Sequence, residues 1–161
     1  MKKEMYSALN EHINFEIESA YIYLQLSLIM EDKNYKGYAA WLRDHFHEEL
    51  KHGDAFIKFI QERGHKPVLN DIKCHDYDIT EPLQVAQLVY EHEQKVSQRI
   101  YKLTDTARET GEYAVEIFLH GFVKEQTEEE DITRDILEKF TMAGNDMAAK
   151  LFLDRELGSI K

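Results

Sequence analysis

The sequence has little of what bends or crosslinks a chain. Its 161 residues include 2 prolines, 7 glycines and 1 cysteine. So few prolines and glycines argue against a fold with many tight turns and favour long helices joined by few connections. The single cysteine, Cys74, has no internal disulfide partner, and we expect it to be reduced and without a role.

Long hydrophobic runs are also missing. No segment approaches the roughly eighteen consecutive apolar residues of a membrane-spanning helix. The first residues, Met1 to Glu4, lead directly into an amphipathic segment without the apolar stretch of a secretory signal. We therefore expect a cytoplasmic protein that does not enter membranes.

Basic residues are outnumbered, with 20 Lys and Arg against 31 Asp and Glu and a formal charge of −11. A surface of this sign gains nothing from meeting nucleic acid or an anionic membrane, so we exclude both as partners. Cations are favoured instead. An acidic surface also aids solubility, and the charge alone indicates no more than that.

The chain is long enough to bury a core, since 43% of it is hydrophobic and 32% is charged. It contains no internal repeat, low-complexity tract or linker. We expect a single all-α domain over residues 1–161.

Four long amphipathic segments and one short one follow each other. The predicted helices are Lys3 to Glu31, Tyr38 to Arg63, Glu81 to Thr110, Glu112 to Thr141 and the short Met147 to Leu157. Gly64 suits the position after the second helix because glycine accepts the left-handed conformation. Thr80 is predicted to cap the third helix, with Pro82 in its first turn.

The segment from His65 to Glu81 is irregular and contains Pro67. With about seventeen residues it is too long for a hairpin between adjacent antiparallel helices. We therefore predict a crossover along the bundle, which makes the second and third helices parallel.

Each long segment carries an apolar stripe with steps of three and four residues, and a carboxylate interrupts each stripe. In the first helix the stripe from Leu9 to Met30 contains Glu16, and Tyr23 lies two turns further on the same side. Glu49 interrupts the second stripe, which runs through Leu42 and Phe46, and Glu93 interrupts the third. Two carboxylates interrupt the fourth stripe, which contains Val115, Phe118, Phe122, Glu125, Glu129, Ile132 and Ile136.

The second helix adds an imidazole, in the step Glu49-Leu50-Lys51-His52. At 3.6 residues per turn, Glu49 and His52 project from the same side and can hold one metal ion between them. An unpaired charge at a core position costs several kcal/mol, so these carboxylates need a cation or a proton.

Five carboxylates and one histidine from four helices predict a metal centre. Oxygen-rich ligation with one imidazole suits iron, manganese or another first-row ion better than a closed zinc site. Shared carboxylates allow two ions. Tyr23 is a core residue whose hydroxyl can also hydrogen-bond a ligating carboxylate.

With these residues in place, the sequence resembles the prokaryotic non-haem ferritins over essentially its full length. The segments that carry the resemblance are Asn10–Glu16, Glu48–His52, Tyr90–Gln94 and Glu125–Glu130. The resemblance implies a ferritin-like four-helix bundle with a long crossover and a short fifth helix, assembled into a shell of 24 subunits. It also implies a ferroxidase centre that oxidises Fe(II) with dioxygen and passes ferric iron to a mineral core.

The resemblance assigns ligands by position. Glu16, Glu49 and His52 match the ligands of a first iron, with Glu49 bridging to a second iron held by Glu93 and Glu129. Gln126 matches a polar residue beside the second iron. A third site, which some relatives possess, would take Glu48, Glu125 and Glu128, with Glu129 shared. From the residues alone, Glu48 and Glu128 could equally be solvated surface residues.

Two departures and two rivals remain. Gly121 stands where many relatives have a tryptophan. Leu50 replaces the methionine of the haem-containing relatives, and Gln126-x-x-Glu129 has no histidine, so we expect no haem.

A rubrerythrin-like di-iron oxidoreductase would normally have a second Glu-x-x-His or a Cys-rich iron domain. A non-catalytic helical assembly module, with structural glutamates, is the other alternative.

Overall fold

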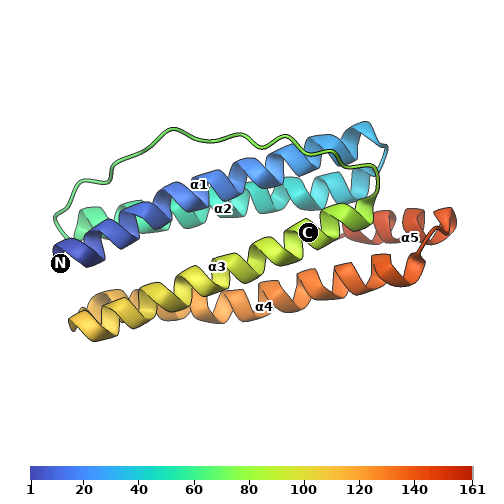
Figure 1. Ribbon diagram of the computed structural model, residues 1–161. Coiled ribbons are helices and arrows are strands. Elements are labelled where there is room, and N and C mark those ends of the chain that lie inside the picture. Colours follow the sequence, from blue (N-terminus) through green and yellow to red (C-terminus); the bar gives the residue numbers. More distant parts are fainter. Residues whose placement is uncertain (161) are drawn as a thin grey trace.

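A computed structural model describes residues 1–160 of the chain as five α-helices. Their bounds are α1 Lys3–Asp32, α2 Lys36–Glu62, α3 Pro82–Thr110, α4 Tyr113–Ala143 and α5 Met147–Gly158. Figure 1 shows four long helices side by side and α5 packed across one end of them. The all-α prediction is confirmed, and each predicted helix forms within two residues of its expected ends.

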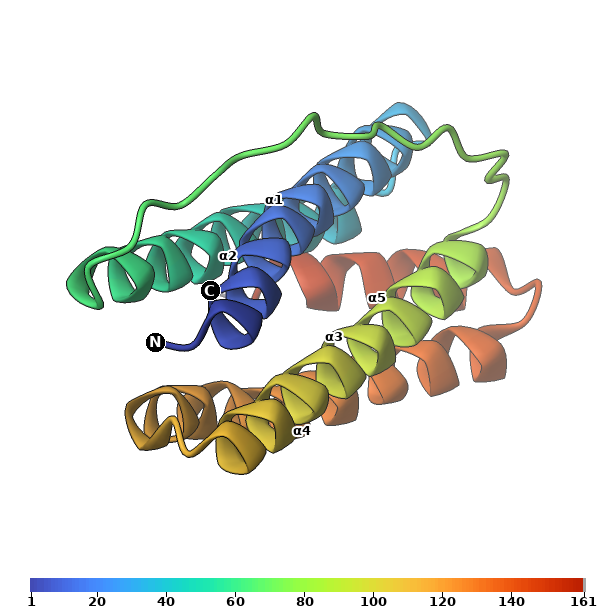
Figure 2. The ribbon, with the colours of Figure 1, turned by 60° about the vertical axis from the view of Figure 1, so that its left-hand side comes forward.

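The bundle consists of two antiparallel hairpins, α1 with α2 and α3 with α4, which are the most closely packed helix pairs. The chain between α2 and α3 runs back along the outside of the first hairpin, so α2 and α3 point in the same direction (Figures 1 and 2). The predicted crossover and the parallel pair are therefore confirmed.

Asparagines of α1 hold the crossover in place. The amide of Asn10 donates from Nδ2 to the Val68 carbonyl at 3.0 Å and accepts from the Val68 N–H at 2.7 Å. Asn14 repeats the arrangement with the N–H of Asn70 at 2.7 Å. These bonds satisfy backbone groups that have no partners of their own in an extended segment.

The buried core falls into two apolar clusters, one toward each end of the bundle. One contains Tyr23, Leu42, Val89 and Phe140, and the other contains Ile13, Phe56, Ile100 and Leu119. Between them, at mid-length, each helix buries a polar residue instead: Glu16, Glu49, Glu93 and Gln126. The metal-binding candidates therefore lie in a polar band between two dry clusters.

The stripe predicted for α4 is out of register. Glu125 is only half buried, and Ile132 is 43% exposed. The residues that α4 buries are Val115, Leu119, Gln126, Thr133, Ile136 and Phe140. Phe118 and Phe122 reach the core from the flank, with their rings 5.0 and 4.7 Å from that of Phe56. The buried face of α4 therefore passes through Gln126 and Thr133, and not through Glu125 and Ile132 as predicted. The predicted face was wrong because the large Phe118 and Phe122 side chains reach the core from the edge of the helix.

The start of α3 also differs by one residue. Its N-cap is Glu81 and Pro82 occupies the first turn, so the prediction for Pro82 is confirmed and the prediction that Thr80 is the cap is wrong. The Gln84 side chain explains the difference, because its Oε1 accepts from the N–H groups of Thr80 and Glu81 at 2.8 and 3.0 Å. A capping box takes the place of a threonine cap.

Two glycines let α5 approach α2 closely. A Cβ on Gly37 would lie 1.9 Å from the Asp154 carbonyl oxygen, and a Cβ on Gly158 would lie 2.8 Å from the Gly37 Cα. Asp154 also accepts from the Tyr38 N–H at 2.8 Å, near the start of α2.

None of the helices in the described part of the chain combines the length and the hydrophobicity that a membrane span requires.

Candidate metal centre

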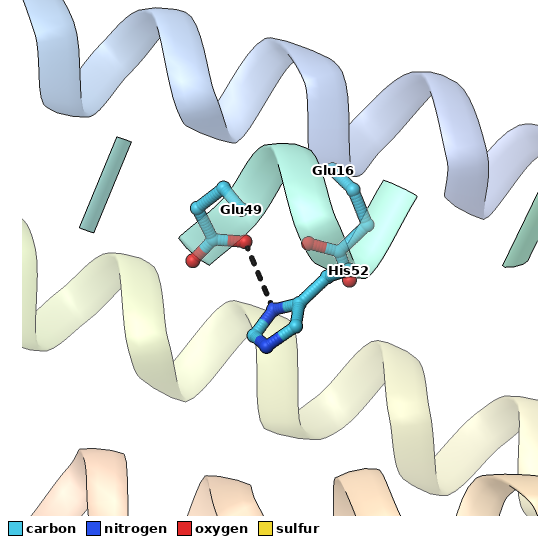
Figure 3. A group of neighbouring side chains, drawn as sticks. All are labelled: Glu16, Glu49 and His52. Atoms are coloured by element: carbon cyan, nitrogen blue, oxygen red, sulfur yellow. Dashed lines mark ion pairs between the residues drawn. The ribbon is translucent and has the colours of Figure 1, made fainter. Parts of the chain in front are cut away.

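Glu16, Glu49 and His52 converge at the middle of the bundle. Figure 3 shows Glu49 and His52 on neighbouring turns of α2, with Glu16 reaching toward them from α1. One ligand atom from each residue lies within 4.8 Å of the other two, and both carboxylates are buried. The predicted fork of Glu49 and His52 is therefore joined by Glu16, as the three ligands of one ion would be.

This group lacks enough hydrogen-bond partners. Oε2 of Glu16 and Oε2 of Glu49 are buried and have no hydrogen bond. His52 Nδ1 lies 3.4 Å from Glu49 Oε2, which is an ion-pair contact without the alignment of a hydrogen bond. Unpartnered carboxylate oxygens in a buried site are costly, and a cation would supply the missing partner.

Burial and mutual repulsion shape the charge of the group. Desolvation and then the Glu16 charge raise the pKa of Glu49 to about 8, and desolvation also raises the pKa of Glu16. Burial alone would lower the pKa of His52, but its hydrogen bond to Glu125 and the neighbouring Glu49 carboxylate raise it to about 11. Protons and an imidazolium thus compensate the charge of the carboxylates in the metal-free protein, as a bound cation would.

Glu93 enters from α3 and is held from two sides. The Tyr23 hydroxyl donates to its Oε1, and Gln126 Nε2 donates to its Oε2 at 3.1 Å. Desolvation, followed by the Glu49 charge, raises the pKa of Glu93 to about 8. The predicted role of Tyr23 as a hydrogen-bonding neighbour of a carboxylate agrees with this geometry, and Gln126 occupies the buried position on α4.

Glu125 and Glu129 extend from α4 toward α2. Glu125 Oε1 lies 3.0 Å from His52 Nε2, and that hydrogen bond lowers the pKa of Glu125. Glu129 Oε2 lies 3.3 Å from His45 Nε2. Both glutamates thus pair with histidines of the facing helix, and neither belongs to the buried group of Glu16, Glu49 and His52.

A second group of possible ligands, which we call the rim group, consists of His45, Glu48 and Glu129. His45 Nε2 lies 3.8 Å from Glu48 Oε2, and its Nδ1 lies 3.1 Å from the Trp41 carbonyl, to which an Nδ1–H would donate. That bond leaves Nε2 toward the two carboxylates, the orientation in which histidines bind metals.

Sequence reasoning missed His45. Its signal was available, since His45 precedes Glu49 by four residues and His52 by seven and therefore lies on their side of the helix. His45 lies beside the apolar stripe through Leu42 and Phe46, so apolar periodicity does not mark it. Glu48 and Glu128 are both exposed, as predicted for residues beside the core stripes.

The donor set suits a first-row ion. Glu16, Glu49, Glu93 and Glu129 supply oxygen and His52 supplies nitrogen, without a thiolate. Hard carboxylates with imidazole are ligands for iron and manganese, and they tolerate an increase in metal charge. The buried, under-partnered oxygens fit such ions, so the residues are compatible with the chemistry expected from the sequence.

Comparisons with known proteins show the family of the chain. A family model described as "Ferritin-like domain" matches residues 6–143. The chain is 31% identical to a bacterial non-heme ferritin of Escherichia coli, over 99% of this chain and 97% of that protein. It is 34% identical to one of Bacteroides fragilis, over 98% of each.

Solved structures give the same result. The open pore ferritin of the hyperthermophilic archaeon Archaeoglobus fulgidus is 37% identical, with a TM-score of 0.97 over 100% of this chain and 99% of that one. A humanized archaeal ferritin is 40% identical, with a TM-score of 0.97 and the same coverage. The ferritin-like bundle predicted from the sequence is thereby confirmed, and the chain belongs to the ferritin family as a relative of the prokaryotic non-haem ferritins.

Proposed function

We propose that this chain is a cytoplasmic iron-storage ferritin. Its subunits oxidise Fe(II) with dioxygen at a di-iron centre inside the bundle, and ferric iron is stored as mineral in a hollow shell of 24 subunits. The observation that carries the proposal is the burial of three glutamates from three helices around one another, with two carboxylate oxygens unpartnered. Iron is the substrate of this site.

Each residue has a part in binding the two ferrous ions. Glu16 and His52 would hold the first ion, Glu93 and Glu129 the second, and Glu49 would bridge them. Glu49 is suited to bridging because Glu16 and His52 both act on its pKa, and its own charge raises the pKa of Glu93 on the other side. Each bound Fe(II) gives one electron to dioxygen, and the carboxylates stabilise the higher charge of Fe(III).

The remaining polar residues position this pair. Tyr23 and Gln126 fix both oxygens of Glu93, so that carboxylate is already oriented before iron binds. Glu125, by hydrogen-bonding His52 Nε2, orients the ring toward Glu49. Glu48, Glu125 and Glu128, with Glu129 shared, would form a third iron site, to which the rim residue His45 is adjacent.

The apolar face of α5 supports assembly. The large apolar residues Met147, Leu151 and Phe152 of α5 are exposed, and this helix has only 12 residues. A helix this short depends on packing for its stability. Neighbouring subunits can cover such faces in a closed symmetric oligomer. An exposed apolar surface alone does not set the number of subunits, which here follows the family resemblance.

The test combines mass and oxidation. The purified, metal-free protein is loaded anaerobically with Fe(II) and then exposed to air, and its mass is followed by light scattering together with the absorbance of ferric iron. We expect a large shell that oxidises Fe(II) and retains far more iron than its binding sites hold. Oxidation without retention would instead favour a rubrerythrin-like oxidoreductase, and neither activity would favour an assembly module.

A further inference from the structure

A small cavity lies between α1 and α3, outside the metal-binding group. Its volume is about 130 Å³, and it is lined by Glu11 and His12 from α1 and by Arg99 and Lys102 from α3, among others. At its inner end, His12 lies with Nε2 2.6 Å from Oε1 of Glu16. One imidazole therefore separates this cavity from the carboxylates of the metal centre.

Two residues that line this cavity have buried nitrogen atoms without hydrogen-bond partners. His12 is fully buried, and its Nδ1 has no hydrogen bond; the short contact of Nε2 with Glu16 is also too poorly aligned to be one. Arg99 Nε is buried and unpartnered as well. A buried polar group without a hydrogen-bond partner destabilises the protein, so a ligand that supplied partners for both residues would relieve that cost.

The charge around the cavity is positive, unlike that of the chain as a whole. Among the described residues, neither Arg99 nor Lys102 has an Asp or Glu oxygen within 4.0 Å, although Glu11 lines the same cavity. An adjoining hollow is lined by both cations and by Lys95, which likewise forms no ion pair there. These three residues occupy one side of α3, at spacings of four and three.

Arg99 is also preorganised. Its guanidinium carbon lies 4.2 Å from the centroid of the Phe15 ring, which holds the planar group by a cation–π contact. Stacking occupies a face of the guanidinium and leaves its N–H donors in the plane free. Guanidinium donors in a fixed plane match the oxygens of an oxyanion.

We propose that this α1–α3 cavity binds a small oxyanion of the phosphate or carbonate class. Arg99 donates hydrogen bonds to the anion, Lys102 contributes its charge, and His12 Nδ1 contacts an oxygen at the inner end. A metal cation is excluded because the two cationic side chains would repel it. Through His12, the bound anion contacts the residue that holds Glu16.

The test measures anion binding by the metal-free, assembled protein, so it does not depend on the proposed oxidation of iron. Inorganic phosphate, bicarbonate and chloride are titrated by calorimetry at constant ionic strength. We expect phosphate or bicarbonate to bind at least tenfold more tightly than chloride, and their relative affinities identify which oxyanion the site prefers. Equal binding of all three anions overturns the proposal.

Variants locate the site. Arg99→Gln and, separately, the exposed Lys102→Gln each remove one charge, and each should weaken oxyanion binding by about tenfold, as loss of a charge-assisted hydrogen bond predicts. Lys124→Gln, on α4, is the matched control and should bind as the unmodified protein does. An equal loss in Lys124→Gln, or unchanged binding in Lys102→Gln, contradicts a site in this cavity.

Discussion

The buried group of Glu16, Glu49 and His52 and the rim group contain the same kinds of residue in different surroundings. Glu49 is 4% exposed, whereas the side chain of its neighbour Glu48 is 49% exposed. Adjacent helical residues point about 100° apart, so one faces the core and the other faces water. The pKa of Glu49 rises to about 8 through burial, and this marks it as a residue that needs a cation or a proton.

The difference shows that residue type alone does not make a metal site. A solvated carboxylate such as Glu48 stays ionised without a bound ion at little free-energy cost, since water stabilises its charge. Ionised Glu16 and Glu49 lack that stabilisation, so they destabilise the metal-free protein. We therefore expect changes in the buried group to alter both stability and oxidation, and changes in the rim group to alter later steps.

The largest expected effect is on oxidation, in Glu49→Ala. Loss of the bridging carboxylate removes a ligand from both irons, so the initial rate of Fe(II) oxidation should fall by at least ~100-fold, more than the loss of a ligand's hydrogen-bonding neighbour usually costs. Stopped-flow absorbance measures the rate. Glu62→Ala, at an exposed glutamate of the same helix, is the control and should retain it. A wild-type rate in Glu49→Ala would remove Glu49 from the centre.

The second effect concerns stability and has the opposite sign. In metal-free protein above pH 8, Glu49→Gln should raise the free energy of unfolding by a few kcal/mol, on the order of the cost of ionising a buried carboxyl group whose folded pKa is raised to about 8, because the amide keeps the shape of the side chain without its charge. Glu48→Gln should change stability by less than ~0.5 kcal/mol. Thermal unfolding in the presence of a chelator measures both, and equal shifts in the two variants would show that the buried charge is not the cause.

A smaller effect is a dependence of metal-free stability on pH. A carboxyl group whose folded pKa is raised, as for Glu49 and Glu93 at about 8, contributes stability below its ordinary value of 4.5 that is lost as pH rises to 8. The pKa of His52 is raised to about 11, so its contribution to stability is also lost as pH rises above 6.5. The pKa values of His12 and His92 are lowered to about 3 and 4, so these two residues reduce the stability of the fold only as pH falls below 6.5.

Between pH 6.5 and 8 these buried groups therefore act together, and the melting temperature of the metal-free protein should fall as pH rises. Bound Fe(II), kept anaerobic, should reverse the trend because the ion replaces the protons. Differential scanning calorimetry at several pH values provides the measurement. A melting temperature that rises over this interval without metal would contradict the assigned charge states.

The smallest effects belong to the exposed glutamates of the proposed third site. Glu48→Ala and Glu128→Ala should leave the oxidation of the first two irons per subunit unchanged. A second addition of Fe(II) should then be oxidised a few-fold more slowly or with a different oxygen consumption, because the third site would affect regeneration of the pair. If both additions behave as in the unmodified protein, these glutamates are only solvated surface.

Much of the fold followed from the sequence because the interrupted stripes of α1, α2 and α3 are regular. Glu16, Glu49 and Glu93 replace apolar residues at strictly helical spacing, and all three are buried as expected. The length of the crossover fixed the direction of α3. These features depend on local periodicity and chain length, which a single sequence contains.

The errors have a common physical cause. On α4, Phe118 and Phe122 are large enough to reach the core from the edge, so apolar periodicity alone places the buried face through them and through Glu125 rather than Gln126. His45 shares a side of α2 with Glu49 and His52, but its pairing with Glu129 of α4 arises only when the helices are assembled. Side-chain reach and partners across helices depend on tertiary packing, and helical periodicity does not encode them.

The positions of bound iron would show whether the buried carboxylates hold a di-iron centre. Crystals soaked anaerobically with Fe(II) would be measured by anomalous diffraction at the iron absorption edge. We expect one peak among Glu16, Glu49 and His52 and a second among Glu49, Glu93 and Glu129, both inside the bundle. Iron bound only beside Glu48 and His45, with no peak in the buried group, would contradict this expectation.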